Sequence, residues 1–272
     1  NGMKISRMSE IIGLFRAVIF CPEHLNIIKE GPSMRRFYLD VAISQLRPLY
    51  LRSLQRYNHI LQQRNKLIKN AEKDRKSFDA TIEFWSAQLA AEAANITKQR
   101  LRYIEAAERE LKVCFDEMTG GRETPSLEYD FSFKIKPEEA ADAKCAQEIF
   151  FSQLMSSHDR EIYAGATLWG IHKDDLIIRL DGKNARNFAS QGQQRSLALG
   201  LKLSEAAISA SNTGESPVLL LDDVFSELDT ERRSYLCERM KRGQVIMTAC
   251  SDVDLQNEHV NVIRVENGKY SS

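Results

Sequence analysis

The chain has 272 residues, with 38 Lys and Arg against 38 Asp and Glu and 43% hydrophobic residues, a composition ordinary for a globular protein with a sizeable core. It contains no apolar run of about 18 residues that would span a bilayer, and its first residues lack the order of a signal peptide, so we expect a cytoplasmic protein without a membrane partner. The five cysteines are odd in number and widely spaced, so the sequence suggests neither a disulfide framework nor a CxxC zinc pair.

The charge is unevenly distributed along the chain. Residues 1–76 carry 15 Lys and Arg against 6 Asp and Glu, whereas residues 77–272 carry 23 against 32. Phosphate contacts need local positive charge, so the basic segment is a weak indicator of nucleic-acid binding. A solvated, charged helix face is the simpler alternative.

The first predicted elements are a tight turn at the start of the chain, a strand and a helix. The chain starts within Asn1-Gly2, a pair that favours a tight hairpin turn, and we expect this start to lie inside a longer protein. The apolar segment Ala17–Phe20, ended by Cys21-Pro22, predicts a buried strand. A helical pattern begins at Ser33.

Two long apolar stripes follow. Large apolar residues between Tyr50 and Ile68 recur at 4-3-4-7 spacing, and a second stripe runs from Phe78 to Met118. Each stripe needs a partner, so the sequence predicts two long antiparallel helices, separated by a polar break at residues 70–76, that form a helical arm. The pair Gly120-Gly121 is expected to end the second helix.

The rest of the chain is expected to have α/β order. Alternation from Tyr129 to Ile135 predicts a strand with one wet face, and Pro137 opens a helix that is expected to reach about Ser157. The further predicted elements are strand Leu176–Leu180, a turn at Asp181–Asn184, helix Gln193–Ala210, strand Val218–Leu221, helix Thr230–Lys241, strand Val245–Thr248 and strand Val260–Val265.

The strongest chemical signal is the strand that ends in Asp222 and Asp223. A strand buried on both faces delivers its next residues to the carboxyl edge of the sheet, where α/β proteins bind ligands. Mg²⁺ prefers hard oxygen ligands, so one carboxylate beside phosphate oxygens suffices to anchor it. The second carboxylate then polarises an attacking water. Two acids that merely cap the next helix are the alternative.

A second signal lies 32 residues before Asp222, where Ser190, Gln191, Gly192, Gln193 and Gln194 open an amphipathic helix. The N-terminus of a helix attracts anions through its N–H groups and dipole, and Gly192 permits close approach. An ordinary serine cap is the alternative, but the spacing to the acidic strand favours an anion site.

These motifs resemble a known family. A signature helix, a strand with two acids and then S-x-L-D at Ser226–Asp229 are similar to the second half of an ABC-type ATPase head. The strings S-Q-G-Q-Q-R and L-L-L-D-D-V-x-S-E-L-D resemble the RecF family in particular. Further marks that agree, over essentially the whole chain, are Pro22-Glu23, Gly31-Pro32, Arg35-Arg36-x-Tyr38-Leu39-Asp40, Gln63-Arg64-Asn65 and Gly170–Asp175.

The chain departs from the family at two points. Ile171 and Lys173 stand where the family writes Pro and Arg, which keeps the charge of that loop. The 272 residues also contain no G-x-x-x-x-G-K-[ST] phosphate loop, which in the family lies upstream of the point where this chain begins. We therefore expect an inactive half of the active site here, and a slow DNA-associated ATPase in the intact protein.

The resemblance implies a fold and a role for each matching residue. It implies an α/β fold in which residues 1–32 and 126–272 form the head and residues 33–125 the arm. Asp222 and Asp223 would be catalytic, Asp222 as the Mg²⁺ ligand, and Thr248 would sense the γ-phosphate. Residues Ser190, Gln191, Gly192, Gln193 and Gln194 would bind ATP held by the opposite subunit, with Ser226 and Asp229 at the dimer seam. The DNA-binding candidates are Arg35, Arg36, Arg52, Arg56, Arg64, Lys66, Lys69 and Lys73.

The implied function is DNA repair, replication and recombination, including the SOS response. ATP would join two heads into a homodimeric clamp on duplex DNA and single/double-strand junctions, with RecO, RecR and RecA as partners. An SMC- or Rad50-like head remains an alternative, although its arm would be far longer. A transporter nucleotide-binding domain, which predicts no arm, and a non-enzymatic adaptor are the others.

Overall fold

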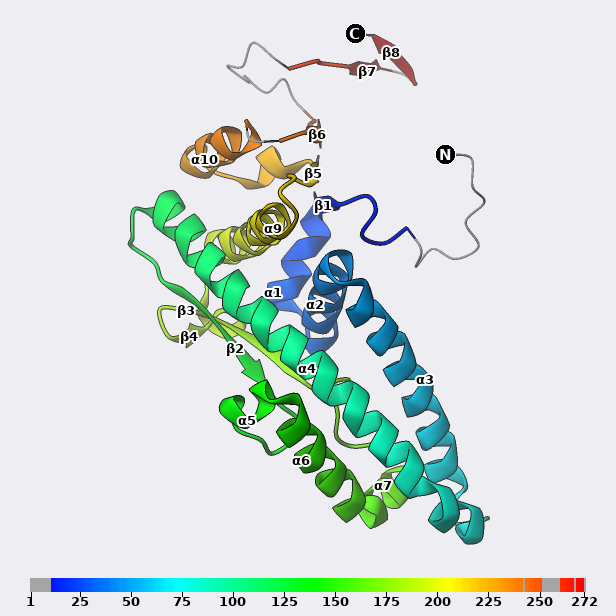
Figure 1. The fold of residues 1–272 in the computed structure, drawn as a ribbon. Helices are drawn as coiled ribbons and strands as arrows, with labels where there is room; N and C mark the ends of the chain where they lie inside the picture. The colour runs from blue at the N-terminus through cyan, green and yellow to red at the C-terminus, as the bar shows by residue number, and fades with distance from the viewer. Residues whose placement is uncertain (1–10, 242, 251–259, 267, 272) are drawn as a thin grey trace.

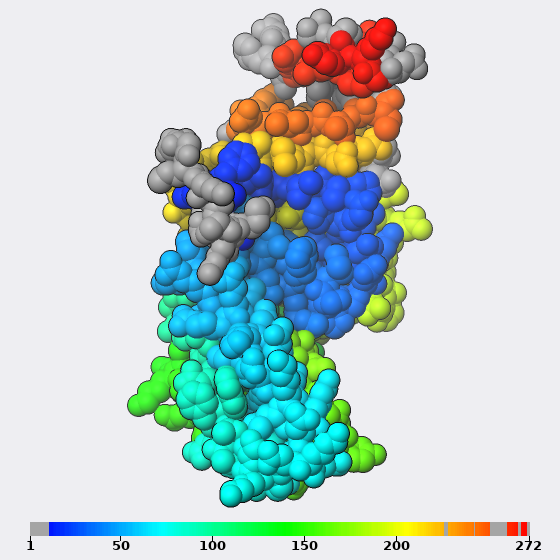
Figure 2. All heavy atoms as spheres, turned by 90° about the vertical axis from the view of Figure 1, so that its right-hand side faces the viewer, coloured from blue at the N-terminus to red at the C-terminus, as the bar shows by residue number. Residues whose placement is uncertain are grey.

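The computed structural model describes residues 11–241, 243–250, 260–266 and 268–271. At one end lies a parallel sheet in which β5 (Val218–Asp222) pairs with both β1 (Ala17–Phe20) and β6 (Val245–Thr248). All three strands were predicted, and all are confirmed. Figure 2 shows the blue region that contains β1 lying directly beside the later strands of this sheet.

The two faces of this sheet differ in exposure. Val18, Phe20 and Leu221 are buried on the face toward α9 (Gln191–Thr213), which extends the predicted signature helix by a few residues at each end. On the opposite face, Ile19 is 45% and Ile246 57% exposed. The register Ile19↔Leu220↔Ile246 therefore presents an apolar row to the surface.

The predicted helical arm is confirmed. Helix α3 (Pro48–Asn70) and the 45-residue helix α4 (Arg75–Thr119) run antiparallel and pack together, and they extend away from the sheet (Figure 1). The two stripes meet between them, with Tyr57 and Leu89 fully buried. Asp74 caps the start of α4, and Gly120, with φ +62°, ends it as expected.

A second, antiparallel sheet lies beside the arm. It consists of β2 (Pro125–Asp130), β3 (Asp175–Leu180) and β4 (Lys183–Asn184), and the predicted turn before β4 is a hairpin with positive φ at Asp181 and Gly182. Helix α2 (Pro32–Leu46) packs against β3 and α3. Figure 1 shows α6 lying along the side of α4 away from α3.

Two predicted elements in this region differ from the structure. The strand expected at Tyr129–Ile135 ends at Asp130, because Ser132 donates its N–H to Asp174 instead of a strand partner and Phe133 stacks on Phe150. The helix expected from Pro137 to Ser157 is broken into α5 (Pro137–Ala141) and α6 (Ala143–Ser156). The break lies at Asp142, whose extended backbone lets its carboxylate accept the first N–H groups of α6.

The remaining elements are short, apart from one helix after the acidic strand. They are η2 (Pro22–Leu25), α1 (Asn26–Lys29), α7 (His158–Ala164), α8 (Ala185–Phe188), η3 (Val224–Glu227), α10 (Thr230–Met240), β7 (Arg264–Glu266) and β8 (Lys269–Ser271). The strand predicted at Val260–Val265 is thus present only in its last two residues. Among the described helices, none combines the length and the apolarity needed to cross a membrane.

The arm and the signature helix meet in close contact. A Cβ atom at Gly200 of α9 would lie 2.7 Å from Leu111 Cδ1 and 3.2 Å from Phe115 Cε2, both on α4. A larger residue at this position would force the Leu111 side chain to shift within a packed core. One continuous core runs from the sheet into the arm, and it includes residues of both α4 and α9.

Candidate active site

The two predicted carboxylates lie at the carboxyl end of β5, as expected. Asp222 is exposed and pairs in register with Thr248 on β6. Thr248 Oγ1 donates a hydrogen bond to Asp222 Oδ1 at 2.5 Å. The structure thus brings together the predicted metal ligand and the predicted sensor, which come from neighbouring strands.

Asp223 forms a sharp turn directly after the strand. Its φ of +48° is unusual for a residue with a side chain, although Asp tolerates this region better than most. The turn directs the Asp223 N–H toward Thr248, where it donates to Oγ1 at 3.1 Å and to the carbonyl at 3.2 Å. These bonds tie the acidic turn to the end of β6.

Two residues near these acids were not predicted from the sequence. Arg195 lines a small pocket together with Asp222, Asp223 and residues of η2. Cys250 lies close enough for the negative charge of Asp223 to raise the pKa of its thiol. Arg195 belongs to the signature string S-Q-G-Q-Q-R, but nothing in its spacing indicated that it lines a pocket with the carboxylates.

The signature residues form a capping box at the start of α9. Ser190 Oγ accepts from the Gln193 N–H at 3.3 Å, and Gln193 Oε1 accepts from the Ser190 N–H at 2.8 Å. Ser190 and Gln191 are exposed, whereas Gln194 is buried and donates to the Ala189 carbonyl. The hydroxyl of Ser190 is therefore held in place at the surface, where the sequence predicted an anion site.

The start of α10 lies beside the start of α9. Asp229 caps α10 by accepting the Arg232 N–H at 3.0 Å, and its carboxylate also pairs with the Arg232 guanidinium. Arg232 Nη1 lies 4.0 Å from the position of a Cβ on Gly192, so this arginine reaches the signature turn. Ser226, the other predicted seam residue, lies in η3, and its side chain is outside the described part of the chain.

The acidic strand end fits a single-carboxylate magnesium site. Asp222 offers exposed hard oxygen atoms at the sheet edge, and Thr248 engages one of them. Within the described ranges, no group of three or more His, Cys, Asp or Glu is placed to hold a metal. Any Mg²⁺ bound at Asp222 would need most of its ligands from phosphate oxygens and water.

Two of the basic residues predicted to contact DNA are buried instead. Arg35 donates to both carboxylate oxygens of Asp175, at 2.7 and 2.8 Å, and to the Glu30 carbonyl. Arg64 is fully buried and pairs with Glu161 at 2.7 Å. Because their charges are neutralised inside the fold, both residues hold the structure together rather than meeting phosphate, which corrects the expectation for them.

The other basic candidates lie nearer the surface. Arg36 is partly buried and donates to the Asp174 carbonyl at 2.8 Å. Arg56 is 65% exposed and pairs with Glu92 at 3.2 Å. The remaining candidates are exposed on α3 and the turn that follows it: Arg52, Lys66, Lys69 and Lys73.

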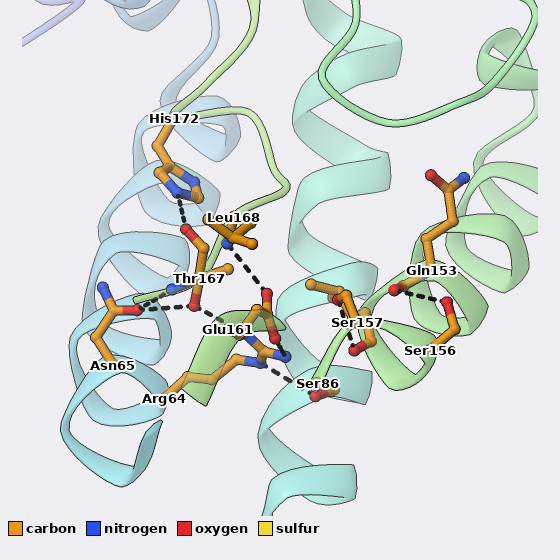
Figure 3. A network of polar contacts seen from close by, with 11 residues as sticks. Arg64, Asn65, Ser86, Gln153, Ser156, Ser157, Glu161, Thr167, Leu168 and His172 are labelled. Atoms are coloured by element: carbon orange, nitrogen blue, oxygen red, sulfur yellow. Dashed lines mark hydrogen bonds and ion pairs between the residues drawn. The ribbon is translucent and has the colours of Figure 1, made fainter. Parts of the chain in front are cut away.

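Arg64 is the centre of a polar network near the far end of the arm (Figure 3). It also donates to Ser86 Oγ of α4 and to Thr167 Oγ1, while Asn65 accepts from Thr167. The network joins α3, α4, α7 and the segment before β3. A fully satisfied buried network of this kind specifies one arrangement of the elements it joins.

The Gly170–Asp175 loop makes a second set of buried polar contacts with the arm. His172 Nδ1 lies 2.7 Å from the Tyr57 hydroxyl on α3, and burial lowers the pKa of His172 to about 4. Gly170 has φ +140°, and a Cβ there would lie 2.2 Å from the Tyr57 hydroxyl. Burial raises the pKa of Asp174, which accepts from Tyr129 and Ser132. The loop therefore fastens the arm to the antiparallel sheet.

The fold and the site define a class of protein. A strand that ends in two carboxylates, a capped signature helix, an S-x-L-D turn and an inserted helical arm together mark an ABC-type ATPase head.

Curated relatives show to which family within this class the chain belongs. The chain is 39% identical to the DNA replication and repair protein RecF of Halothermothrix orenii, over 98% of this chain and 72% of the relative. It is 35% identical to RecF of Clostridium novyi, with the same coverage. The chain belongs to the RecF family.

Solved structures agree with this assignment. The chain matches the recombination mediator protein RecF with ATPrS in the RecFOR pathway with a TM-score of 0.88 and 35% identity, over 98% of this chain and 70% of the other. It matches the corresponding RecF-ATP structure with a TM-score of 0.84 and 36% identity, over 94% and 68%. No protein-family model matches the chain.

Proposed function

We propose that this chain forms the signature half of an ATP-dependent clamp that acts in DNA replication and repair. The proposal rests mainly on the start of α9, where a reciprocal capping box holds the Ser190 hydroxyl at the surface. Accepting the Gln193 N–H leaves the hydroxyl proton of Ser190 to donate outward. This proton and the helix N-terminus would engage the γ-phosphate of ATP held by a second subunit.

The acidic strand end supplies the hydrolytic part of the proposal. Asp222 would anchor Mg²⁺, which when bound would neutralise phosphate charge. Asp223 would orient or deprotonate the attacking water, and the contact between Thr248 and Asp222 supports a sensor role for Thr248. Asp229 would approach the dimer seam from the start of α10. Without a phosphate loop, the 272 residues by themselves are proposed to hydrolyse no ATP.

The outer face of α3 is the proposed DNA-contacting surface. The exposed basic side chains of α3 and of the turn after it, from Arg52 to Lys73, would contact phosphates without sequence preference. This helix lies on the side of the arm that faces the viewer in Figure 2, below the sheet. Arg36 is partly buried and is also proposed to contact DNA.

The cellular setting follows from the relatives. The similar RecF structures are described as belonging to the RecFOR pathway, which supports RecO and RecR as partners. RecA is proposed as a downstream partner on the family resemblance alone. A cytoplasmic location is part of the same proposal. We also propose a division into head (1–32 and 126–272) and arm (33–125). The projection of α3 and α4 from the sheet supports the arm, although α6, which this division assigns to the head, packs along α4 (Figure 1).

The clamp is tested in an extended chain, meaning these residues preceded by the phosphate-loop segment that the family resemblance implies. Ser190→Arg places a bulky cation where the second subunit's γ-phosphate must dock. We expect the variant to bind ATP as a single head but to lose ATP-dependent dimerisation in sedimentation. Normal dimerisation of Ser190→Arg would refute the clamp, and Ser211→Arg, at the other end of α9, is the matched control.

A further inference from the structure

The turn that follows the arm helix contacts the signature motif through Glu123. This residue lies four positions after Thr119, the last residue of α4, and its Oε1 accepts a hydrogen bond from Gln193 Nε2 at 2.9 Å. The contact bridges 70 residues of sequence. It joins the end of the arm helix to the helix start at which the γ-phosphate is proposed to bind.

The Glu123 contact decides how the Gln193 side chain is oriented. A carboxylate only accepts hydrogen bonds, so the amide must direct its NH₂ group toward Glu123. The amide oxygen then faces the other way, where it accepts the Ser190 N–H at 2.8 Å. With the opposite orientation, two acceptors would face each other and two donors would face each other.

The oriented amide in turn fixes Ser190. Its N–H is held by Gln193 Oε1, and its Oγ accepts the Gln193 N–H at 3.3 Å. The Gln194 N–H closes the first helical turn onto the Ser190 carbonyl at 2.9 Å. The chain of contacts therefore runs from Glu123 through Gln193 to the hydroxyl that faces outward.

Helix α4 leads directly into the turn that carries Glu123. Helix α4 is a single element of 45 residues whose far part contributes Ser86 to the buried Arg64 network. Near its end, Leu111 and Phe115 pack directly onto Gly200 of the signature helix. A shift of α4 that moved the turn at residues 120–124 relative to α9 would break the contact between Glu123 and Gln193.

We infer that Glu123 is a positioning residue of the signature motif, through which the arm helix controls the readiness of Ser190 to bind a γ-phosphate. Its neighbour Arg122 lies on the same turn but donates to the Thr119 carbonyl at 2.7 Å and pairs at 3.5 Å with Glu231 of α10. The side chains of Arg122 and Glu231 are both more than 70% exposed. Arg122 thus offers a matched control on the same turn that does not contact the signature motif.

The first test needs only this chain and does not depend on the proposed function. Amide hydrogen exchange is measured at Ser190 and Gln193 in Glu123→Ala, Glu123→Gln and Arg122→Ala. Removing the acceptor should speed exchange at both amides about fivefold, as expected for loss of part of a cap. Glu123→Gln keeps an acceptor oxygen and should restore protection, and Arg122→Ala should leave it unchanged.

The outcomes separate positioning from general loosening of the turn. Unchanged exchange in Glu123→Ala would overturn the inference, and so would equal acceleration in Glu123→Gln or in Arg122→Ala. Thermal unfolding of each variant, expected to stay within a few degrees of the unmodified chain, shows that the fold is intact.

The second test rests on the proposed function and uses the extended chain. Glu123→Ala should require about tenfold more protein for ATP-dependent dimerisation, with single-head ATP affinity unchanged, and Glu123→Gln should recover most of this loss. Equal dimerisation of Glu123→Ala and the unmodified chain would overturn control of the clamp. If even the unmodified chain failed to dimerise with ATP, the proposed function would fall, while the exchange result would still stand.

Discussion

Thr248 and Asp222 are joined by a hydrogen bond of 2.5 Å that crosses from β6 to β5. Thr248→Val keeps the shape of the side chain but removes this donor and the acceptor of the Asp223 N–H. We expect ATP turnover of the extended chain to fall about 10- to 100-fold, as for other groups that orient a metal ligand. Thr248→Ser keeps the hydroxyl and should retain most activity in a phosphate-release assay. Equal loss in both variants would show that packing, not the hydroxyl, matters.

Asp223→Asn is expected to separate ATP hydrolysis from ATP-dependent dimerisation. The change keeps the size of the side chain but removes the proposed base, so turnover of the extended chain should fall by roughly 10²-fold or more. ATP binding and ATP-dependent dimerisation should persist, because one negative charge beside the nucleotide is removed. Sedimentation and phosphate release measured on one preparation check both expectations, and retained turnover would remove Asp223 from the catalytic role.

DNA contact by α3 predicts a change in salt dependence. Arg52→Ala and Lys66→Ala should each lower the slope of log K against log salt concentration by about 1 for binding to a duplex oligonucleotide. Arg109→Ala is the control, because Arg109 is also exposed but lies on α4 in an ion pair with Glu105. A slope unchanged in all three variants would place the DNA surface elsewhere.

The buried pair of Arg64 and Glu161 predicts large and coupled losses of stability. Arg64→Met or Glu161→Gln alone leaves an uncompensated buried group and should lower the free energy of unfolding by about 3–5 kcal/mol. The double variant should lose less than the sum of the two. Urea unfolding measures all three, and Arg109→Ala should cost under about 1 kcal/mol because its pair is exposed. Additive single losses would contradict coupling.

His172 makes stability depend on pH. Its pKa in the folded chain is about 4, below the ordinary value near 6.5 that it regains on unfolding. The unfolded chain therefore binds the proton first as pH falls, so this contribution is constant above about pH 6.5 and is lost between pH 6.5 and 4. The loss is at most about 1.4 kcal/mol per pH unit.

The measurement for His172 is urea unfolding at several pH values. His172→Gln should flatten the slope between pH 6.5 and 4, and the slope that remains comes in part from His24, whose pKa burial also lowers to about 4. An unchanged slope in His172→Gln would show that His172 already accepts a proton in the folded chain.

Local patterns were sufficient to predict the elements that depend on neighbours in sequence. The run Val218–Leu221 before two acids identified β5 and its carboxylates, and the stripes from Tyr50 and Phe78 identified the arm. The end of β2 was missed because it depends on Asp174, some 40 residues away, which captures Ser132. Alternation alone does not reveal that competitor.

For a similar reason, the sequence could not show which basic side chains are paired inside the fold and which are exposed. Arg35 and Arg52 look alike as charges in a basic segment, yet Arg35 meets Asp175, 140 residues away, and Arg52 meets solvent. The link between Glu123 and Gln193 was likewise invisible, since a glutamate after a glycine pair carries no motif. Long-range partners, not residue types, decide these roles.

The Arg64–Glu161 pair also orders events during synthesis. The two residues are 97 positions apart, so Arg64 leaves the ribosome roughly 5–20 s before its partner. In that interval α3 and α4 are able to join along their apolar stripes, but burying the guanidinium without its carboxylate would cost several kcal/mol. The far ends of α3 and α4 are therefore expected to pack together only after α7 has been synthesised. This makes them the last part of the arm to fold on a nascent chain.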